Sequence, residues 1–195
     1  MATFLEELAA ASDLQHVVTD TLFSSVPYLF ADDRALWSSW KSTLALGLDV
    51  DPHSVLLVGS SAVGVSLNPN KVFRPFDATS DIDVAVISTR HFEEAWHTLR
   101  SLGVRMLGLS RRVQTEIRQY APNYVYWGVI ATDRLLGVLD FGPSWQEALA
   151  SMRQAEPTRD RRIRVRLYRD IGALRTYQLR ALREARASLD DPEDT

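Results

Sequence analysis

The sequence predicts an α+β protein in which helices flank a mixed β-sheet. The chain has 195 residues, of which 46% are hydrophobic and 24% are charged, and this is the composition of an ordinary globular protein. Two short, continuous apolar runs, at 54–59 and 82–88, have the length of buried strands. Segments at both ends of the chain have the wider apolar spacing of helices. Strands in the middle of the chain, with helices around them, are therefore expected.

The elements are expected in the following order. Helices open the chain, and the second of them runs from about Asp33 to Leu46. The run 54–59 is a buried strand, and a loop rich in Asn, Pro and Lys follows it. The run 82–88 is the next strand, and Thr89 is expected to cap the helix after it. The remaining candidates are strands at 123–131 and 134–141, a helix at 144–154, an edge strand or helix start at 161–169, and a helix at 171–189.

These elements suggest three parts: N-terminal helices at 1–50, a core at 51–157, and a basic strand or helix at 158–195 that packs on the core and ends in an acidic tail. The chain has no cysteine, which excludes disulfides, thiolate metal sites and cysteine nucleophiles. It has no apolar run of the roughly 20 residues needed to span a bilayer, and its acidic start is unlike a signal peptide. A cytoplasmic protein without membrane contact is expected.

The first candidate for chemistry is the segment 58–64 (VGSSAVG), where a strand is expected to end and a helix to begin. Gly59 allows the backbone to approach a ligand closely. Ser60 adds a hydroxyl, and the backbone N–H groups at a helix start bind phosphate oxygens. A tight strand-to-helix turn without a ligand explains the same residues, so both interpretations stay open.

The second candidate is the start of the next strand. Asp81 and Asp83 are two positions apart, so both carboxylates point to the same face of the sheet, while Ile82, Val84 and Val86 point into the core. Two like charges this close repel each other unless a cation lies between them. Mg²⁺ takes oxygen ligands and usually shares its coordination sphere with phosphates. Two surface acids at a solvent-facing strand start are the alternative.

The third candidate is Asp140, at the end of the strand expected at 134–141 and flanked by apolar residues. A carboxylate buried in such a place requires a metal or another cation. The alternative is a turn or helix-capping aspartate beside Gly142 and Pro143.

A Gly-Ser turn after a strand, a later Asp-x-Asp strand and a third strand-borne Asp together resemble the active site of the DNA polymerase β-like nucleotidyltransferases. The resemblance covers roughly 54–142 and implies a polymerase β-like nucleotidyltransferase core for 51–157. It implies that Gly59 and Ser60 hold the triphosphate of an NTP, and that Asp81 and Asp83 bind two Mg²⁺ or Mn²⁺ ions. It also implies that Asp140 ligates the metal nearer the acceptor and accepts or relays the acceptor's proton.

The spacing between these motifs departs from the family. The Asp-x-Asp pair usually follows the Gly-Ser by about a dozen residues, whereas twenty residues, 61–80, separate Ser60 from Asp81 here. Longer spacings occur in synthases of nucleotide second messengers and in related bacterial defence enzymes. Lys71 and Arg74 in this segment are expected to bring positive charge to the triphosphate. Surface cations on a loop are the alternative.

The resemblance implies a metal-dependent enzyme that moves a nucleoside monophosphate from an NTP such as ATP to an acceptor hydroxyl. The short chain favours a small molecule or a partner protein as acceptor, in a minimal bacterial nucleotidyltransferase associated with antiviral defence or a toxin–antitoxin pair. Two alternatives stay open because fold does not decide function. One is a non-catalytic nucleotide-binding or scaffolding subunit of a toxin–antitoxin or anti-phage complex, and the other is a nucleotidyltransferase that modifies RNA.

The segment 158–186 is strongly basic, with ten Arg against three acidic residues. If 161–169 is a strand, Arg162, Arg164 and Arg166 share one face while the apolar residues between them face the core. Such a row of guanidiniums is expected to bind phosphates, from a nucleic acid or from the NTP itself. An edge strand guarded by charge is the alternative.

Overall fold

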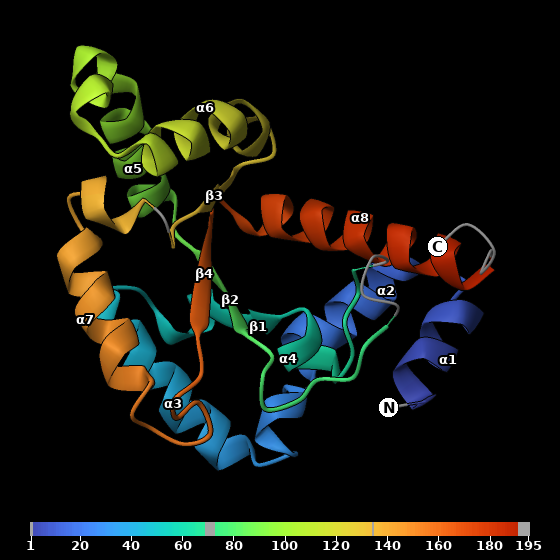
Figure 1. Ribbon diagram of the computed structural model, residues 1–195. Coiled ribbons are helices and arrows are strands. Elements are labelled where there is room, and N and C mark those ends of the chain that lie inside the picture. Colours follow the sequence, from blue (N-terminus) through green and yellow to red (C-terminus); the bar gives the residue numbers. More distant parts are fainter. Residues whose placement is uncertain (1, 69–72, 134, 191–195) are drawn as a thin grey trace.

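The computed structural model describes residues 2–68, 73–133 and 135–190, and its centre is a four-stranded mixed sheet (Figure 1). The strands are β1 (Val55–Val58), β2 (Ile82–Ile87), β3 (Val129–Ala131) and β4 (Ile163–Tyr168), in the spatial order β1-β2-β4-β3. β2 and β4 are parallel, whereas β1 and β3 run antiparallel to their neighbours. Helices cover both faces of the sheet, which confirms the predicted α+β class with a mixed sheet.

The helices vary from single turns to 20 residues. The helix expected at about 33–46 forms as α3 (Arg34–Gly47). Asp33 caps it by accepting a 2.9 Å hydrogen bond from the backbone N–H of Leu36. The helix after β2 is capped by Ser88, one residue before the expected Thr89. The α-helices are α1 (Ala2–Ala10), α2 (Leu14–Thr19), α3 (Arg34–Gly47), α4 (Ser60–Val63), α5 (Thr89–Ser101), α6 (Arg111–Tyr126), α7 (Gly142–Met152) and α8 (Ile171–Asp190). The short turns are η1 (Asp20–Ser24), η2 (Tyr28–Phe30), η3 (Pro52–Ser54), η5 (Gly103–Gly108) and η6 (Leu136–Val138).

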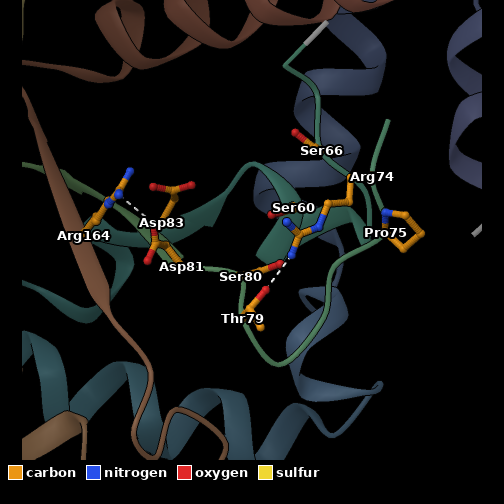
Figure 2. Close-up of a pocket in the computed structure, with 9 residues that line it drawn as sticks. All are labelled: Ser60, Ser66, Arg74, Pro75, Thr79, Ser80, Asp81, Asp83 and Arg164. Carbon is orange, nitrogen blue, oxygen red and sulfur yellow. Dashed lines mark hydrogen bonds and ion pairs between the residues drawn. The ribbon is translucent and has the colours of Figure 1, made fainter. Parts of the chain in front are cut away.

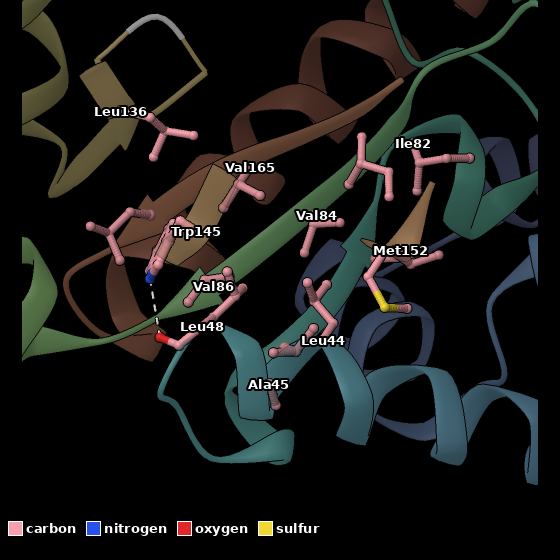
Figure 3. Close-up of a cluster of buried hydrophobic side chains, with 14 of the residues drawn as sticks. Leu44, Ala45, Leu48, Ile82, Val84, Val86, Leu136, Trp145, Met152 and Val165 are labelled. Atoms are coloured by element: carbon pink, nitrogen blue, oxygen red, sulfur yellow. Dashed lines mark hydrogen bonds between the residues drawn. The ribbon is translucent and has the colours of Figure 1, made fainter. Parts of the chain in front are cut away.

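The sheet separates two hydrophobic cores. Ile82, Val84 and Val86 alternate along β2 and are fully buried in the first core, which α3, α5 and α7 cover (Figure 3). In that core the indole N–H of Trp145 donates a 3.1 Å hydrogen bond to the carbonyl of Leu48, which joins α7 to the end of α3. The opposite face packs against α1, α2 and α8 through a second core. The period of two along each strand thus sends alternate residues into different cores.

One of the expected strands forms only over its last three residues, and another does not form. The segment 123–131 is the end of α6 followed by the three-residue β3, and 134–141 contains the 3₁₀ turn η6 in place of a strand. Leu136 and Leu139 are buried beneath α7, so their apolar side chains reflect burial in the core although the backbone here is not a strand. Apolar runs this short do not distinguish a strand from a buried turn.

The segment 161–169 contains a strand, and the strand is interior. β4 pairs with β2 on one side and with β3 on the other, so the expectation of an edge strand is wrong. The basic segment is therefore part of the sheet itself. None of the helices in the described ranges is both long and apolar enough to cross a membrane.

Candidate functional site

At one end of the sheet, across the direction of the strands, the ends of β1 and β3 lie beside the starts of β2 and β4. Val58, the last residue of β1, lies opposite Asp83 near the start of β2, and Asp83 lies opposite Arg164 near the start of β4. At the far side Ala131, the last residue of β3, lies opposite Arg166. Residues after β1 and β3 and residues at the starts of β2 and β4 therefore meet there. We call this end of the sheet the polar edge.

Gly59 joins β1 to α4 with a backbone conformation that only glycine adopts readily. Its φ and ψ are 62° and −148°, a region that is closed to residues with a side chain. A Cβ built at this position would lie 3.4 Å from Oδ2 of Asp83, which is ordinary van der Waals contact, so the need for glycine comes from the backbone conformation. Ser60 then begins the single turn of α4, and the predicted strand-to-helix turn is confirmed.

Asp81 and Asp83 lie on the same side of β2, as their spacing predicts. Figure 2 shows both carboxylates next to each other, with Arg164 of β4 approaching them. Nη2 of Arg164 lies 2.7 Å from Oδ2 of Asp81, and both side chains remain partly exposed. The Asp pair is therefore met by an arginine on the neighbouring strand, where the resemblance led us to expect a third acid.

Burial raises the pKa of Asp83 above its ordinary value. The guanidiniums of Arg166 and Arg164 oppose this effect, while the negative charges of Asp81 and Asp133 add to it. Asp133 follows β3 at the polar edge, and its Oδ2 lies 4.0 Å from Nη2 of Arg162. Acidic side chains and arginines thus lie close together along the polar edge, and charges of both signs affect the pKa of Asp83.

Two adjoining cavities open at the polar edge, and we refer to them together as the recess. The smaller has a volume of about 100 Å³ and the larger about 390 Å³. Sites for small molecules commonly enclose about 300–1,000 Å³, so the recess has a suitable size. Residues that line both cavities are Ser60, Ser66, Asp83 and Arg164; Asp81 and Arg74 line the smaller, and Gly59, Arg166, Tyr177, Gln178 and Glu184 are among those that line the larger.

The inserted loop folds back beside the Gly-Ser turn and brings Arg74 to the recess. The backbone N–H of Ser66 donates to the carbonyl of Arg74 at 2.9 Å, which fixes the two sides of the loop together. Nη2 of Arg74 forms a 2.7 Å ion pair with Asp77 and also donates to the hydroxyl of Thr79. Hydrogen bonds from Thr79 and Arg74 hold the pKa of Asp77 well below its usual range. Lys71, predicted to act with Arg74, lies outside the described residues.

Asp140 does not join the other predicted residues. It is exposed in the turn between η6 and α7, and it is not among the described residues that line the recess. The ring of Phe141, its neighbour, packs 4.9 Å from His91, which follows the far end of β2. Six strand residues separate the two ends of β2, a length of about 20 Å. The expected convergence of three carboxylates is therefore wrong for Asp140, because the strand that was to carry it does not form.

Some residues of the recess were expected from the sequence and others were not. Arg164 and Arg166 were predicted to share one face and to meet phosphates, but their position beside Asp83 depends on the parallel pairing of β4 with β2. On α8, Tyr177 and Gln178 line the larger cavity, and the ring of Tyr177 lies 5.4 Å from the guanidinium carbon of Arg166. The only local signal was the alternation of Arg with apolar residues, which reveals a face but not a strand partner.

The donor set at the polar edge fits a divalent cation that arrives with its substrate. Mg²⁺ commonly uses one or two carboxylates, with phosphate and water oxygens completing its sphere. Asp81 and Asp83 supply two carboxylates beside one cavity. Among the described residues no three acidic or histidine side chains form a group that could hold a metal ion by themselves.

Comparison with known proteins leaves the geometry as the basis for assigning function, because no family model, no curated protein and no solved structure matches this chain.

Proposed function

We propose that the recess binds an NTP with Mg²⁺ or Mn²⁺, and that the protein is a nucleotidyltransferase that moves the nucleoside monophosphate to an acceptor hydroxyl. One observation carries the proposal. The carboxylates of Asp81 and Asp83 share a recess with the glycine-only turn at Gly59 and with the guanidiniums of Arg164 and Arg166. A site for a metal-bound polyphosphate needs these groups: oxygen ligands for the cation, close backbone approach, and positive charge for the phosphates.

Each group has a role in this proposal. Asp81 and Asp83 hold the cation, which when bound neutralises the triphosphate and lowers the pKa of the attacking hydroxyl. The backbone at Gly59 and the hydroxyl of Ser60 approach the phosphate oxygens. Arg166, held against the ring of Tyr177, contributes charge that a guanidinium does not lose near neutral pH. Positioning and charge stabilisation are the main contributions of a protein to phosphoryl transfer.

The acceptor site is proposed at the α8 side of the recess. Tyr177, Gln178 and Glu184 line that side and offer an aromatic ring, an amide and a carboxylate. Gln178 is 8% exposed, so its amide is held in place by packing and faces a restricted space. These groups suit the hydroxyls of a small molecule, or a side chain of a partner protein inserted into the recess.

The test is to incubate the protein with Mn²⁺ or Mg²⁺ and each labelled NTP, and to measure pyrophosphate and labelled protein, RNA or small products. Asp81→Asn and Asp83→Asn should lower metal-dependent NTP binding and transfer at least tenfold, because each removes a ligand of the cation. Asp140→Asn is the matched control, since this carboxylate lies away from the recess, and it should keep binding and transfer. Equal binding of Mn–NTP by Asp81→Asn, Asp83→Asn and the parent would overturn the proposal.

A second candidate is a nucleotide-binding subunit without turnover. It is favoured by the 2.7 Å ion pair between Arg164 and Asp81, and by the position of Asp140, the expected third acid, away from the recess. This candidate predicts metal-dependent NTP binding without pyrophosphate release or transfer to any acceptor. The RNA-based alternative has less support, because Arg164 pairs with Asp81 and Arg166 packs on Tyr177, so the arginine row is not an open basic surface.

A further inference from the structure

Opposite charges from two adjacent parallel strands meet in the recess. Asp81 and Asp83 of the β2 side line it together with Arg164 and Arg166 of β4. Nη2 of Arg164 lies 2.7 Å from Oδ2 of Asp81. This oxygen belongs to the Asp pair proposed to bind the cation, so the arginine and the cation compete for the same carboxylate.

Arg164 also has an unused donor. Its Nε is buried and has no hydrogen-bond partner among the described residues. A buried N–H without an acceptor is unfavourable, and a guanidinium cannot relieve this by losing its proton near neutral pH. The same side chain lines both cavities of the recess, where the oxygens of a phosphate would meet it. Because this Nε is buried, a phosphate in the recess would meet the terminal nitrogens of the guanidinium, one of which contacts Asp81 in the empty recess.

These contacts disfavour each of the two ligands when it binds alone. A cation that binds alone must displace Arg164 from Asp81 and then remain beside two guanidiniums, which repel it. A triphosphate that binds alone meets two carboxylates, which repel it as well. When both bind together, the cation takes Asp81 and the triphosphate takes Arg164, so each ligand removes what opposes the other.

We propose that Arg164 is a built-in counter-ion that occupies Asp81 in the empty recess and transfers to the phosphates when a divalent cation and a polyphosphate bind as one complex. This inference rests on the proposed function and adds how the site selects its ligand. The recess takes the metal–polyphosphate complex and discriminates against free metal and free polyphosphate. The two ligands are coupled, and such coupling commonly changes affinity about 5- to 150-fold.

The test uses Mn²⁺ and inorganic triphosphate, so that no nucleobase has to be known. Calorimetry measures the affinity of the whole protein for Mn²⁺ alone, for preformed Mn–triphosphate, and for triphosphate with EDTA. Arg164→Gln should bind Mn²⁺ alone about tenfold more tightly than the parent and Mn–triphosphate about tenfold more weakly. Arg162→Gln is the matched control: it removes a guanidinium from the same strand, but Arg162 contacts Asp133 and does not line the described cavities.

A second pair of variants tests the same exchange from the side of the carboxylate. Asp81→Asn releases Arg164, so it should bind triphosphate in EDTA about tenfold more tightly than the parent. The double variant Asp81→Asn with Arg164→Gln should lose this gain. A gain that persists in the double variant would show that Arg164 is not the group involved, and would overturn the inference.

The outcomes separate this inference from the proposed function. If the parent binds neither Mn–triphosphate nor any Mn–NTP, the proposed site is wrong and the inference is wrong with it. If the parent binds Mn–triphosphate but Arg164→Gln leaves the affinity for Mn²⁺ alone unchanged, the site stands and the counter-ion role is overturned. Equal affinity of the parent for triphosphate with and without Mn²⁺ would also overturn the coupling.

Discussion

At the scale of single residues, Gly59 determines the backbone conformation at the end of β1, beside the Asp pair. Its φ of 62° with ψ of −148° places the carbonyl and the next N–H where no residue with a Cβ holds them without strain. A Cβ there would lie 3.4 Å from Oδ2 of Asp83, in ordinary van der Waals contact. The requirement for glycine is therefore a requirement of the backbone.

Gly59→Ala should lower the free energy of unfolding by about 1–3 kcal/mol, the usual cost of a residue held in a sparsely populated backbone region. It should also weaken Mn–triphosphate binding, because relief of the backbone strain moves the N–H groups proposed to approach the phosphates. Urea denaturation and calorimetry measure the two effects. Gly137→Ala is the control, since a Cβ there meets no atom within 4 Å, and its effect should stay within about 0.5 kcal/mol. Equal stability of Gly59→Ala and the parent would contradict the strain.

At the scale of elements, β4 is the strand on which both cores and the polar edge depend. Val165 and Leu167 are buried in the first core at 1% and 0% exposure, while Arg164 and Arg166 on the other side line the recess. Because β4 pairs with strands on both sides, its alternation places charged groups at the recess from the interior of the sheet. A solvated edge strand would not hold them as rigidly.

Leu167→Ala tests the packing of β4 in the first core. It should lower the free energy of unfolding by about 2–5 kcal/mol, because it leaves a cavity in the first core. Leu46→Ala makes the same change on the outer side of α3, where the side chain is 83% exposed, and should change stability by about 0.5 kcal/mol or less. Chemical denaturation of both variants gives the comparison. Similar stabilities for the two would mean that Leu167 is not packed in a core.

The same elements show which parts of the fold the sequence reveals. β1 and β2 were predicted from short, continuous apolar runs, and α3, α5, α7 and α8 from segments with the composition and spacing of helices. The segment at 123–131 was misassigned because its aromatic and β-branched residues favour strands, and α6 overrides that preference. The pairing of β4 between β2 and β3 was not predicted, since pairing joins segments that are distant in sequence.

The candidate site also has a part that the sequence predicted and a part that it did not. Gly59, Ser60, Asp81 and Asp83 lie together because β1 and β2 are antiparallel neighbours, so the end of one meets the start of the other. Their pattern is local to two strands and could be recognised in the sequence. Asp140 depended on a strand that does not exist, and the arginines that take part in the recess depended on a strand partner. Local patterns were sufficient for the Asp pair and insufficient for its neighbours.

At the scale of the whole molecule, His91 connects the start of α5 to the end of the sheet away from the recess. Its ring is 2% exposed and packs 4.9 Å from the ring of Phe141 and 5.2 Å from that of Trp145. Its Nδ1 lies 2.9 Å from the hydroxyl of Ser88. Burial lowers the pKa of His91 below its ordinary value, and the charge of Arg90 lowers it further. The folded protein therefore favours a neutral ring.

This preference predicts how stability depends on pH. As pH falls below about 6.5, the unfolded chain binds a proton at this histidine before the folded chain does, so stability decreases. In His91→Gln the melting temperature should fall less between pH 7.5 and pH 5.5 than it does in the parent. His97→Gln, which removes an exposed histidine of the same helix, should keep the parent's pH dependence. An unchanged slope in His91→Gln would exclude the buried ring as the cause.

The order of strands in the sheet differs from their order in the chain, and this has a consequence for biosynthesis. About 75 residues separate the end of β2 from the start of β4, so at roughly 5–20 residues per second the ribosome needs about 4–15 s to synthesise them. During that interval β1 and β2 can pair, but one edge of β2 has no neighbour, and β3 has none either. Unpaired strand edges are prone to join other chains. In the nascent chain the edges of β2 and β3 that β4 joins therefore stay unpaired until β4 is synthesised. A ribosome that stalls before residue 163 leaves these edges exposed to other chains.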